Sequence, residues 1–309
     1  MDASVRTSPR SGVRLERFKS KYLKPQTLTS VLWVIVRAII LLGLCYIILY
    51  PFFIKIINAF KTYSDFIDPT VRFLPKNFTL DNIKHVINEM NYWTTLRNTV
   101  VICLILSPLQ TLVCAVTGYG FARFRFKLRG ICFFLVIFSL IVPSQTILLP
   151  LYLKFKTFLG VFNLIGTPWP LVIMSLTGLG IKNGLYIFMF RQFFRNMPKE
   201  LEEASYLDGC GTVRTFTKIM LPAATSTMVT VFLLSLAWQW TDTVFTPRFL
   251  DDIDIMSRNV NALMQSAGKP IEVANYVNIG AVLAVIPIAL VYIVLQKFFV
   301  ESIDRAGIV

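Results

Sequence analysis

Charged residues are scarce in this 309-residue chain, at 16% of the sequence, against roughly 25% in an average soluble domain. Hydrophobic residues make up 55%. They are gathered into blocks long enough for the ~20-residue helix that crosses a bilayer. A water-soluble fold cannot bury so much apolar surface, so the sequence predicts a membrane protein with lipid as its main solvent.

Residues for catalysis and metal binding are also sparse. The single histidine is His85, and the five cysteines form no C-x-x-C pair, which argues against a zinc site or a disulfide framework. The chain lacks a glycine-rich phosphate loop ending in Gly-Lys-Ser/Thr, so we do not expect it to hydrolyse ATP or to bind a cofactor itself. Basic residues lie between apolar blocks without an aromatic-plus-basic RNA-binding pattern, so no nucleic-acid partner is expected.

Apolar runs define the predicted membrane topology. An all-α membrane protein with six transmembrane helices follows, and the fourth of its spans is interrupted by Lys182. Prolines inside these runs each free a backbone carbonyl and bend a helix. Bent packing helices are the simpler interpretation, and a path lined by the bends is the alternative. The six predicted spans cover 38–54, 98–122, 130–153, 168–190, 219–241 and 273–296.

The distribution of lysine and arginine predicts the orientation. If the basic tail of residues 1–30 lies inside, the inner segments hold 18 Lys and Arg residues and the outer loops hold 9, without Arg37, Lys55 and Arg97, which border the spans. Under the positive-inside rule both termini are then cytoplasmic, and so is the loop that begins at Arg191. The predicted organisation is a tail over 1–30 and a six-span domain over 31–309, with a distinctive loop over 191–222.

That loop predicts a helix, a turn and a second helix. Pro198 begins the first helix, and carboxylates in its first turns favour the positive end of the helix dipole. Gly209 permits a backbone turn that a residue with a Cβ resists. Val213, Phe216 and Ile219 lie about one turn apart in the second helix, which ends where Pro222 opens the next span. An amphipathic loop lying on lipid headgroups is the alternative.

The spacing within this loop resembles a known signature. Glu203-Ala204-Ser205, three residues, Gly209, nine residues and Ile219-x-Leu221-Pro222 match the E-A-A, G and I-x-L-P pattern of permease subunits of ATP-binding-cassette importers. Residues 119–126 and 191–194 extend the likeness to the carbohydrate-uptake branch, in the position of the six-span second permease. Ser205 replaces the usual alanine, and Trp240-Thr241 replaces the usual Trp-Asn.

The resemblance implies a function and partners. Such a subunit pairs with a second permease, two ATPase subunits that carry ATP and Mg dock beneath, and an extracytoplasmic solute-binding protein delivers a sugar or oligosaccharide across the bacterial plasma membrane. An ion-gradient-driven transporter is the alternative, but no span core contains the Asp or Glu that it would need. An importer of the same class for a non-sugar solute is another. The residues expected to couple the chain to the ATPases are Glu200, Glu202, Glu203, Ala204, Ser205, Asp208, Gly209, Ile219, Leu221 and Pro222.

A second group of residues is predicted along the substrate path. Aromatic faces stack on sugar rings and carboxylates accept hydroxyl hydrogen bonds, although an interfacial aromatic belt is the alternative near the outer end of the fifth span. A lysine about 13 Å deep in the membrane costs several kcal/mol facing lipid, so Lys182 should face water, a partner carboxylate or a polar or anionic glycan. The residues in this group are Gln145, Lys182, Asn183, Trp238, Gln239, Trp240 and Asp242.

Overall fold

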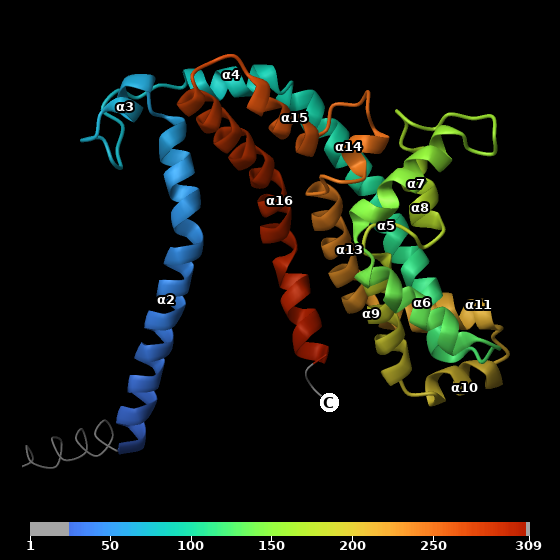
Figure 1. Cartoon of the computed structure of the whole chain (residues 1–309). Coiled ribbons are helices and arrows are strands. Elements are labelled where there is room, and N and C mark those ends of the chain that lie inside the picture. The colour runs from blue at the N-terminus through green and yellow to red at the C-terminus, as the bar shows by residue number, and fades with distance from the viewer. Residues whose placement is uncertain (1–24, 307–309) are drawn as a thin grey trace, which may run out of the picture. The chain divides into compact units, whose positions relative to one another are not determined.

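The computed structural model describes the backbone of residues 25–306 and the side chains of residues 30–296. Every named element in this described part is helical (Figure 1). Residues 1–24 of the predicted basic tail lie outside the described residues, and residues 25–30 belong to the first described helix. The helices are α2 (Pro25–Ala59), α3 (Tyr63–Ile67), α4 (Asp81–Glu89), α5 (Tyr92–Arg123), α6 (Arg129–Ile141), α7 (Ser144–Lys156), α8 (Trp169–Leu176), α9 (Asn183–Asn196), α10 (Glu200–Leu207), α11 (Thr212–Thr215), the π-helix η1 (Phe216–Met220), α12 (Leu221–Ala223), α13 (Thr225–Trp240), α14 (Thr246–Phe249), α15 (Met256–Ala262), the 3₁₀ turn η2 (Leu263–Gln265) and α16 (Pro270–Ala306).

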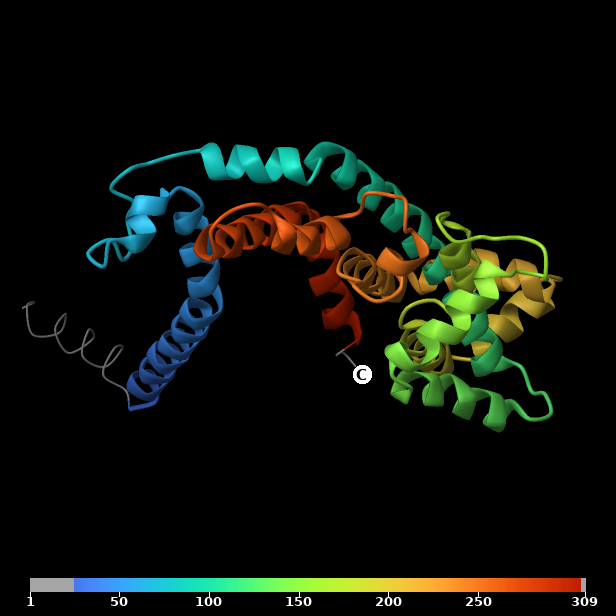
Figure 2. The same cartoon turned by 45° about the horizontal axis from the view of Figure 1, so that its top comes forward.

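The chain forms two units, residues 1–58 and residues 59–309. The first unit is described from Pro25 and consists of α2, whose apolar side chains from Val31 to Phe53 are mostly exposed. Such a surface is compatible with lipid and not with water. The remaining helices belong to the second unit, in which α9 and α13 both pack against α5 (Figure 2).

Three of the six predicted spans are single helices long and apolar enough to cross a membrane: Ser30–Ala59, Tyr92–Arg123 and Pro270–Gln296. Two others are bent pairs. Helices α6 and α7 meet at 105°, and the segment Thr212–Ala223 meets α13 at 76°. The described residues therefore contain three to five candidate spans, and the prediction of six is not confirmed.

The predicted fourth span, over 168–190, is divided in the structure. Helix α8 ends at Leu176 and α9 begins at Asn183. The connection contains two residues in the left-handed region, Gly178 at φ 76° and Lys182 at φ 60°, which a continuous helix does not accommodate. The sequence shows only that a charge interrupts the apolar run at Lys182, whereas the structure also breaks the helix there, so the prediction of one span-length helix is not confirmed.

Helix α5 is the central element of the second unit. It is buried on several sides, against α8, α9 and α13. The approach to α9 is closest at Gly118, where a Cβ would lie 2.5 Å from the Cβ of Phe190 and 2.9 Å from the backbone nitrogen of Arg191. Small residues allow this contact between two membrane helices.

Pro287 in α16 has a packing role of the kind that the sequence analysis favoured. A proline lacks the N–H that would bond the carbonyl four residues earlier, here Leu283. The hydroxyl of Tyr92 donates to that carbonyl at 3.2 Å, and the indole of Trp240 donates to the carbonyl of Ala284 at 2.9 Å. Near Pro287, α16 is therefore bonded to α5 through the freed carbonyl of Leu283 and to α13 through the carbonyl of Ala284.

The contact at Gly118 predicts different effects for two neighbouring substitutions. We expect Gly118→Ala to destabilise the protein by about 1–3 kcal/mol, because the added methyl overlaps backbone and Cβ atoms of α9. Gly120→Ala is the matched control, because the nearest atom to its Cβ is the Phe124 Cδ2 at 3.9 Å. Thermal unfolding in detergent checks this, and equal melting temperatures for both variants would contradict it.

Candidate functional site

The predicted helix, turn and helix of the 191–222 loop are present as α10 and α11. Three carboxylates, Glu200, Glu202 and Glu203, lie in the first turn of α10 as predicted. The helix ends at Leu207, and Gly209 in the turn that follows has φ 77°. The N–H of Gly209 donates to the backbone carbonyl of Tyr206, and the N–H of Cys210 donates to the backbone carbonyl of Ser205, both at 3.0 Å. This pair of bonds is a Schellman motif, which favours glycine at its left-handed position.

Ser205 joins the two helices of the loop. Its side chain is 2% exposed, and its hydroxyl lies 2.8 Å from the hydroxyl of Thr215 on α11. The departure from the family's usual alanine therefore adds a buried hydrogen bond. The partner of Ser205 could not be predicted from the sequence, because Thr215 lies ten residues further along the chain.

Glu202 joins α10 to the end of α5. Its carboxylate oxygen lies 3.4 Å from the Nε of Arg123, and the two side chains are 11% and 8% exposed. The same guanidinium donates to the carbonyl of Met197 at 2.8 Å. Of the carboxylates predicted to couple the chain to the ATPases, Glu202 is therefore an internal connector, while Glu200, Glu203 and Asp208 are exposed.

An aromatic cluster completes this junction. The Tyr119 ring of α5 lies 5.4 Å from the Phe194 ring of α9 and 4.8 Å from the Phe216 ring of η1, centroid to centroid. Met220 and Phe194 are fully buried beside it. The base of the loop is thus part of the same hydrophobic core as α5 and α9, and it is not a loop lying loosely on the surface.

The outer side of the loop carries exposed groups. Ala204, Glu203 and Pro222 are exposed, and Ile219 and Leu221 are half-buried. Two apolar side chains also protrude, Leu207 at 88% and Val213 at 76% exposure. Val213 therefore does not share the half-buried face of Phe216 and Ile219, contrary to the predicted amphipathic spacing.

The predicted start of the fifth span is corrected as well. Pro222 lies in the short helix α12, and the longer helix α13 begins at Thr225 after the 76° bend, so the two segments are long enough for a span only together. The bend occurs at Ala224, where the backbone has φ −85° and ψ 9° instead of helical values. The second helix of the loop therefore meets the span at an angle.

The structure brings together two of the predicted substrate-path residues. The ammonium of Lys182 lies 4.7 Å from the centre of the Trp238 ring. This cation–π contact joins the break between α8 and α9 to the C-terminal end of α13. No carboxylate within the described residues forms an ion pair with Lys182.

The other predicted path residues have separate environments. Asn183 is 1% exposed and neither polar atom of its amide has a hydrogen-bond partner in the described structure, and the carbonyl oxygen of Gln239 is likewise unpaired. Trp240 is bonded to α16, as described above. Asp242 accepts bonds from the backbone N–H of Val244 at 3.0 Å and that of Thr246 at 2.6 Å, which stabilises the start of α14. Gln145 is exposed in the first turn of α7.

Sequence reasoning missed a buried polar cluster around Gln110 of α5. The Gln110 amide nitrogen donates to the Ser175 hydroxyl of α8 at 3.4 Å, and the Ser235 hydroxyl of α13 donates to the Gln110 carbonyl oxygen. All three side chains are at most 1% exposed. A search for charged residues passes over this group, although a glutamine inside an otherwise apolar run is the signal that finds it.

The family of the chain follows from comparison with known proteins. Residues 114–305 match the family model described as "Binding-protein-dependent transport system inner membrane component". The chain belongs to this family, and it is accordingly a permease component of an ATP-binding-cassette importer in the inner membrane and not an ATPase.

Individual relatives are consistent with this assignment. A putative ABC transporter permease from Caldicellulosiruptor is 31% identical over 63% of this chain and 68% of its own. The arabinooligosaccharide transport permease of Halalkalibacterium halodurans is 26% identical over 86% of this chain and 92% of its own. A solved bacterial ABC transporter described as importing the acidic polysaccharide alginate has a chain with a TM-score of 0.69 at 19% identity, covering 88% of this chain and 98% of its own. That last likeness establishes the shared fold.

The buried pair predicts that two adjacent glutamates have different effects on stability. We expect Glu202→Gln to lower the free energy of unfolding by roughly 3 kcal/mol, because it leaves the half-buried guanidinium of Arg123 without its counter-charge. Glu203→Gln, on the exposed side of the same helix, should change it little.

A double-mutant cycle with Arg123→Gln isolates the pair. Thermal or chemical unfolding should show that the double variant loses less stability than the two single variants together. Strict additivity would exclude the pair as a connector.

Proposed function

We propose that this chain is one of two permease subunits of an importer for a sugar or oligosaccharide, and that α10 and α11 transmit ATP-driven motion to the membrane helices. The main support is the structure of the 191–222 loop, which presents exposed groups outward and is bonded to α5 on its inner side. The name of the arabinooligosaccharide relative supports a carbohydrate substrate.

The proposed partners are a second permease, two ATPase subunits and an extracytoplasmic solute-binding protein. ATP and Mg would be held by the ATPase subunits. Leu207 and Val213 offer apolar anchors for a soluble partner, and Glu203 offers a carboxylate for one of its basic residues. The interaction would be specific because the turn at Gly209 fixes the positions of these side chains.

The proposed orientation places both termini and this loop in the cytoplasm. It rests on the excess of Lys and Arg in the inner segments of the sequence. In this orientation ATP-driven closure of the ATPase dimer would displace α10 and α11. The displacement would reach α5 through Arg123 and reach α9 through the aromatic cluster. The translocation path would then open alternately to the two sides.

The proposed substrate path includes Lys182, Trp238 and Asn183. Lys182 and Trp238 together offer a cation and an aromatic face, which suit a polar or anionic sugar. The unpaired amide of Asn183 adds a donor and an acceptor that the described residues leave unused. An ion pair between Lys182 and the second permease is the competing role.

Coupling is tested by substitutions on the outer side of the loop. In proteoliposomes that contain the assembled transporter, Glu203→Lys should abolish uptake because it reverses the charge offered to the ATPase. Gly209→Val should also abolish uptake, because a β-branched residue resists φ 77°.

Gly211→Val is the matched control. Gly211 has φ −77° and, like Gly209, has no atom within 4 Å of its Cβ position. It should therefore retain uptake. Normal uptake by Glu203→Lys or Gly209→Val in assembled complexes would refute the coupling role.

The substrate role of Lys182 predicts a charge-dependent effect. Lys182→Met should weaken uptake and substrate-stimulated ATPase activity several-fold, while Lys182→Arg, which keeps the charge over Trp238, should retain most of both. The apparent affinity for candidate glycans is the quantity to measure. Unchanged kinetics for Lys182→Met in a fully assembled transporter would assign the lysine to structure alone.

A further inference from the structure

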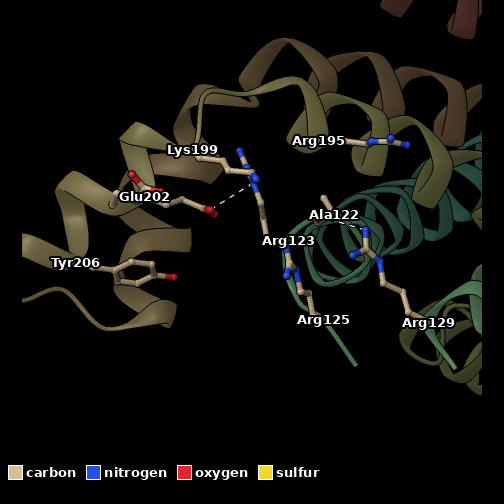
Figure 3. A pocket seen from close by; sticks show the side chains of 9 residues that line it. Ala122, Arg123, Arg125, Arg129, Arg195, Lys199, Glu202 and Tyr206 are labelled. Atoms are coloured by element: carbon tan, nitrogen blue, oxygen red, sulfur yellow. Dashed lines mark hydrogen bonds and ion pairs between the residues drawn. The ribbon is translucent and has the colours of Figure 1, made fainter. Parts of the chain in front are cut away.

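A basic pocket lies beside the coupling loop, residues 191–222, where the end of α5, the start of α6 and the end of α9 face α10 (Figure 3). Its volume is about 490 Å³, within the range of sites that hold a small ligand. Five cations and two carboxylates line it together with two uncharged residues. The lining residues are Ala122, Arg123, Arg125, Arg129, Arg195, Lys199, Glu202, Glu203 and Tyr206.

The positive charge of this pocket is not neutralised within the described residues. Glu202 is paired with Arg123, whereas Arg125, Arg195 and Lys199 form no ion pair there. Burial lowers the pKa of the nearby Arg191 guanidinium, and repulsion from Arg195 and Arg129 lowers it further. A cluster of like charges in one cavity raises the local affinity for an anion.

Two of the guanidinium groups are held in fixed positions by backbone carbonyls. Arg123 donates to Met197 at 2.8 Å, and Arg129 donates to Phe124 at 3.2 Å and to Ala122 at 3.4 Å. Anchored guanidinium groups are favourable for binding tetrahedral oxyanions, because the planar fork makes paired hydrogen bonds to phosphate oxygens.

The segment between α5 and α6 adds a second observation. From Arg123 to Arg129 cations alternate with apolar residues, and Phe124, Phe126 and Leu128 are 45%, 46% and 66% exposed. Exposed aromatic and aliphatic side chains between cations are typical of a segment at the boundary between lipid tails and headgroups. A ligand that combines phosphate with acyl chains satisfies both features.

We propose that this pocket binds a phosphate group, and that the adjacent exposed apolar residues favour an anionic phospholipid headgroup over soluble phosphate as its source. A bound headgroup would touch both the fixed end of α5 and the first turns of α10. Its occupancy would therefore stabilise the position of the coupling loop. The binding claim stands independently of the transport assignment.

The test uses the full-length chain purified with its associated subunits. Reconstituted into nanodiscs of phosphatidylcholine with a titrated share of phosphatidylglycerol, it should retain phosphatidylglycerol on extraction, as measured by native mass spectrometry. Arg125→Gln/Arg195→Gln should weaken retention about tenfold or more, because each basic residue near an anionic surface contributes about 1 kcal/mol. Neither residue belongs to the proposed coupling contacts.

The matched control is Arg214→Gln/Lys218→Gln, which removes the same charge from exposed positions outside the pocket and should retain the lipid. Arg125→Lys/Arg195→Lys keeps the charge and should retain binding in part, which separates binding from misfolding. A second arm adds inorganic phosphate to neutral nanodiscs, and a shift that depends on Arg125 and Arg195 there would identify soluble phosphate as the source.

Equal retention by the pocket variant and the control, together with no response to phosphate, would overturn the proposal. So would loss of the ATPase subunits from the pocket variant with unchanged lipid retention, because the pocket would then be a protein-docking surface.

Discussion

The ion pair between Arg123 and Glu202 connects the most buried helix of the second unit to the loop that carries the family's signature. Arg123 is the last residue of α5, and Glu202 lies in the first turn of α10. A pair of this kind is retained where a fixed relative position matters, because its removal leaves a buried charge without compensation. The aromatic contacts of Tyr119 and the Schellman turn at Gly209 extend this rigidity outward to Leu207.

The remaining features of the second unit position α5 for this role. Gly118 allows close contact with α9, and the cluster around Gln110 joins α5 to α8 and α13. The carbonyl freed by Pro287 bonds α16 to Tyr92 at the other end of α5. Because the helices that surround α5 are held to it by specific polar or close-packed contacts, a force applied at α10 would be distributed through the bundle and not absorbed at one joint.

Local features were the most predictable from the sequence. Apolar runs identified α2, α5 and α16, and glycine at position 209 identified the turn, because each depends on residues that are neighbours in the chain. Breaks within spans were less predictable, because hydropathy measures how apolar a run is and not whether it is straight. Prolines inside the runs predicted bends, but not the 105° angle between α6 and α7, and the division of 168–190 was not foreseen. Partners distant in sequence, such as Glu202 with Arg123 or Ser205 with Thr215, required the fold. The substrate-path and coupling assignments remain predictions.

The central claim is that α10 and α5 move as one body during the transport cycle. Spin labels at Leu201 of α10 and Val116 of α5, which are 43% and 57% exposed, measure this by double electron–electron resonance in an assembled transporter whose five native cysteines are replaced. The account predicts that the distance between the labels changes by less than about 2 Å between the nucleotide-free and ATP-bound states, whereas a change of about 5 Å or more, the scale of one helical turn, would contradict it.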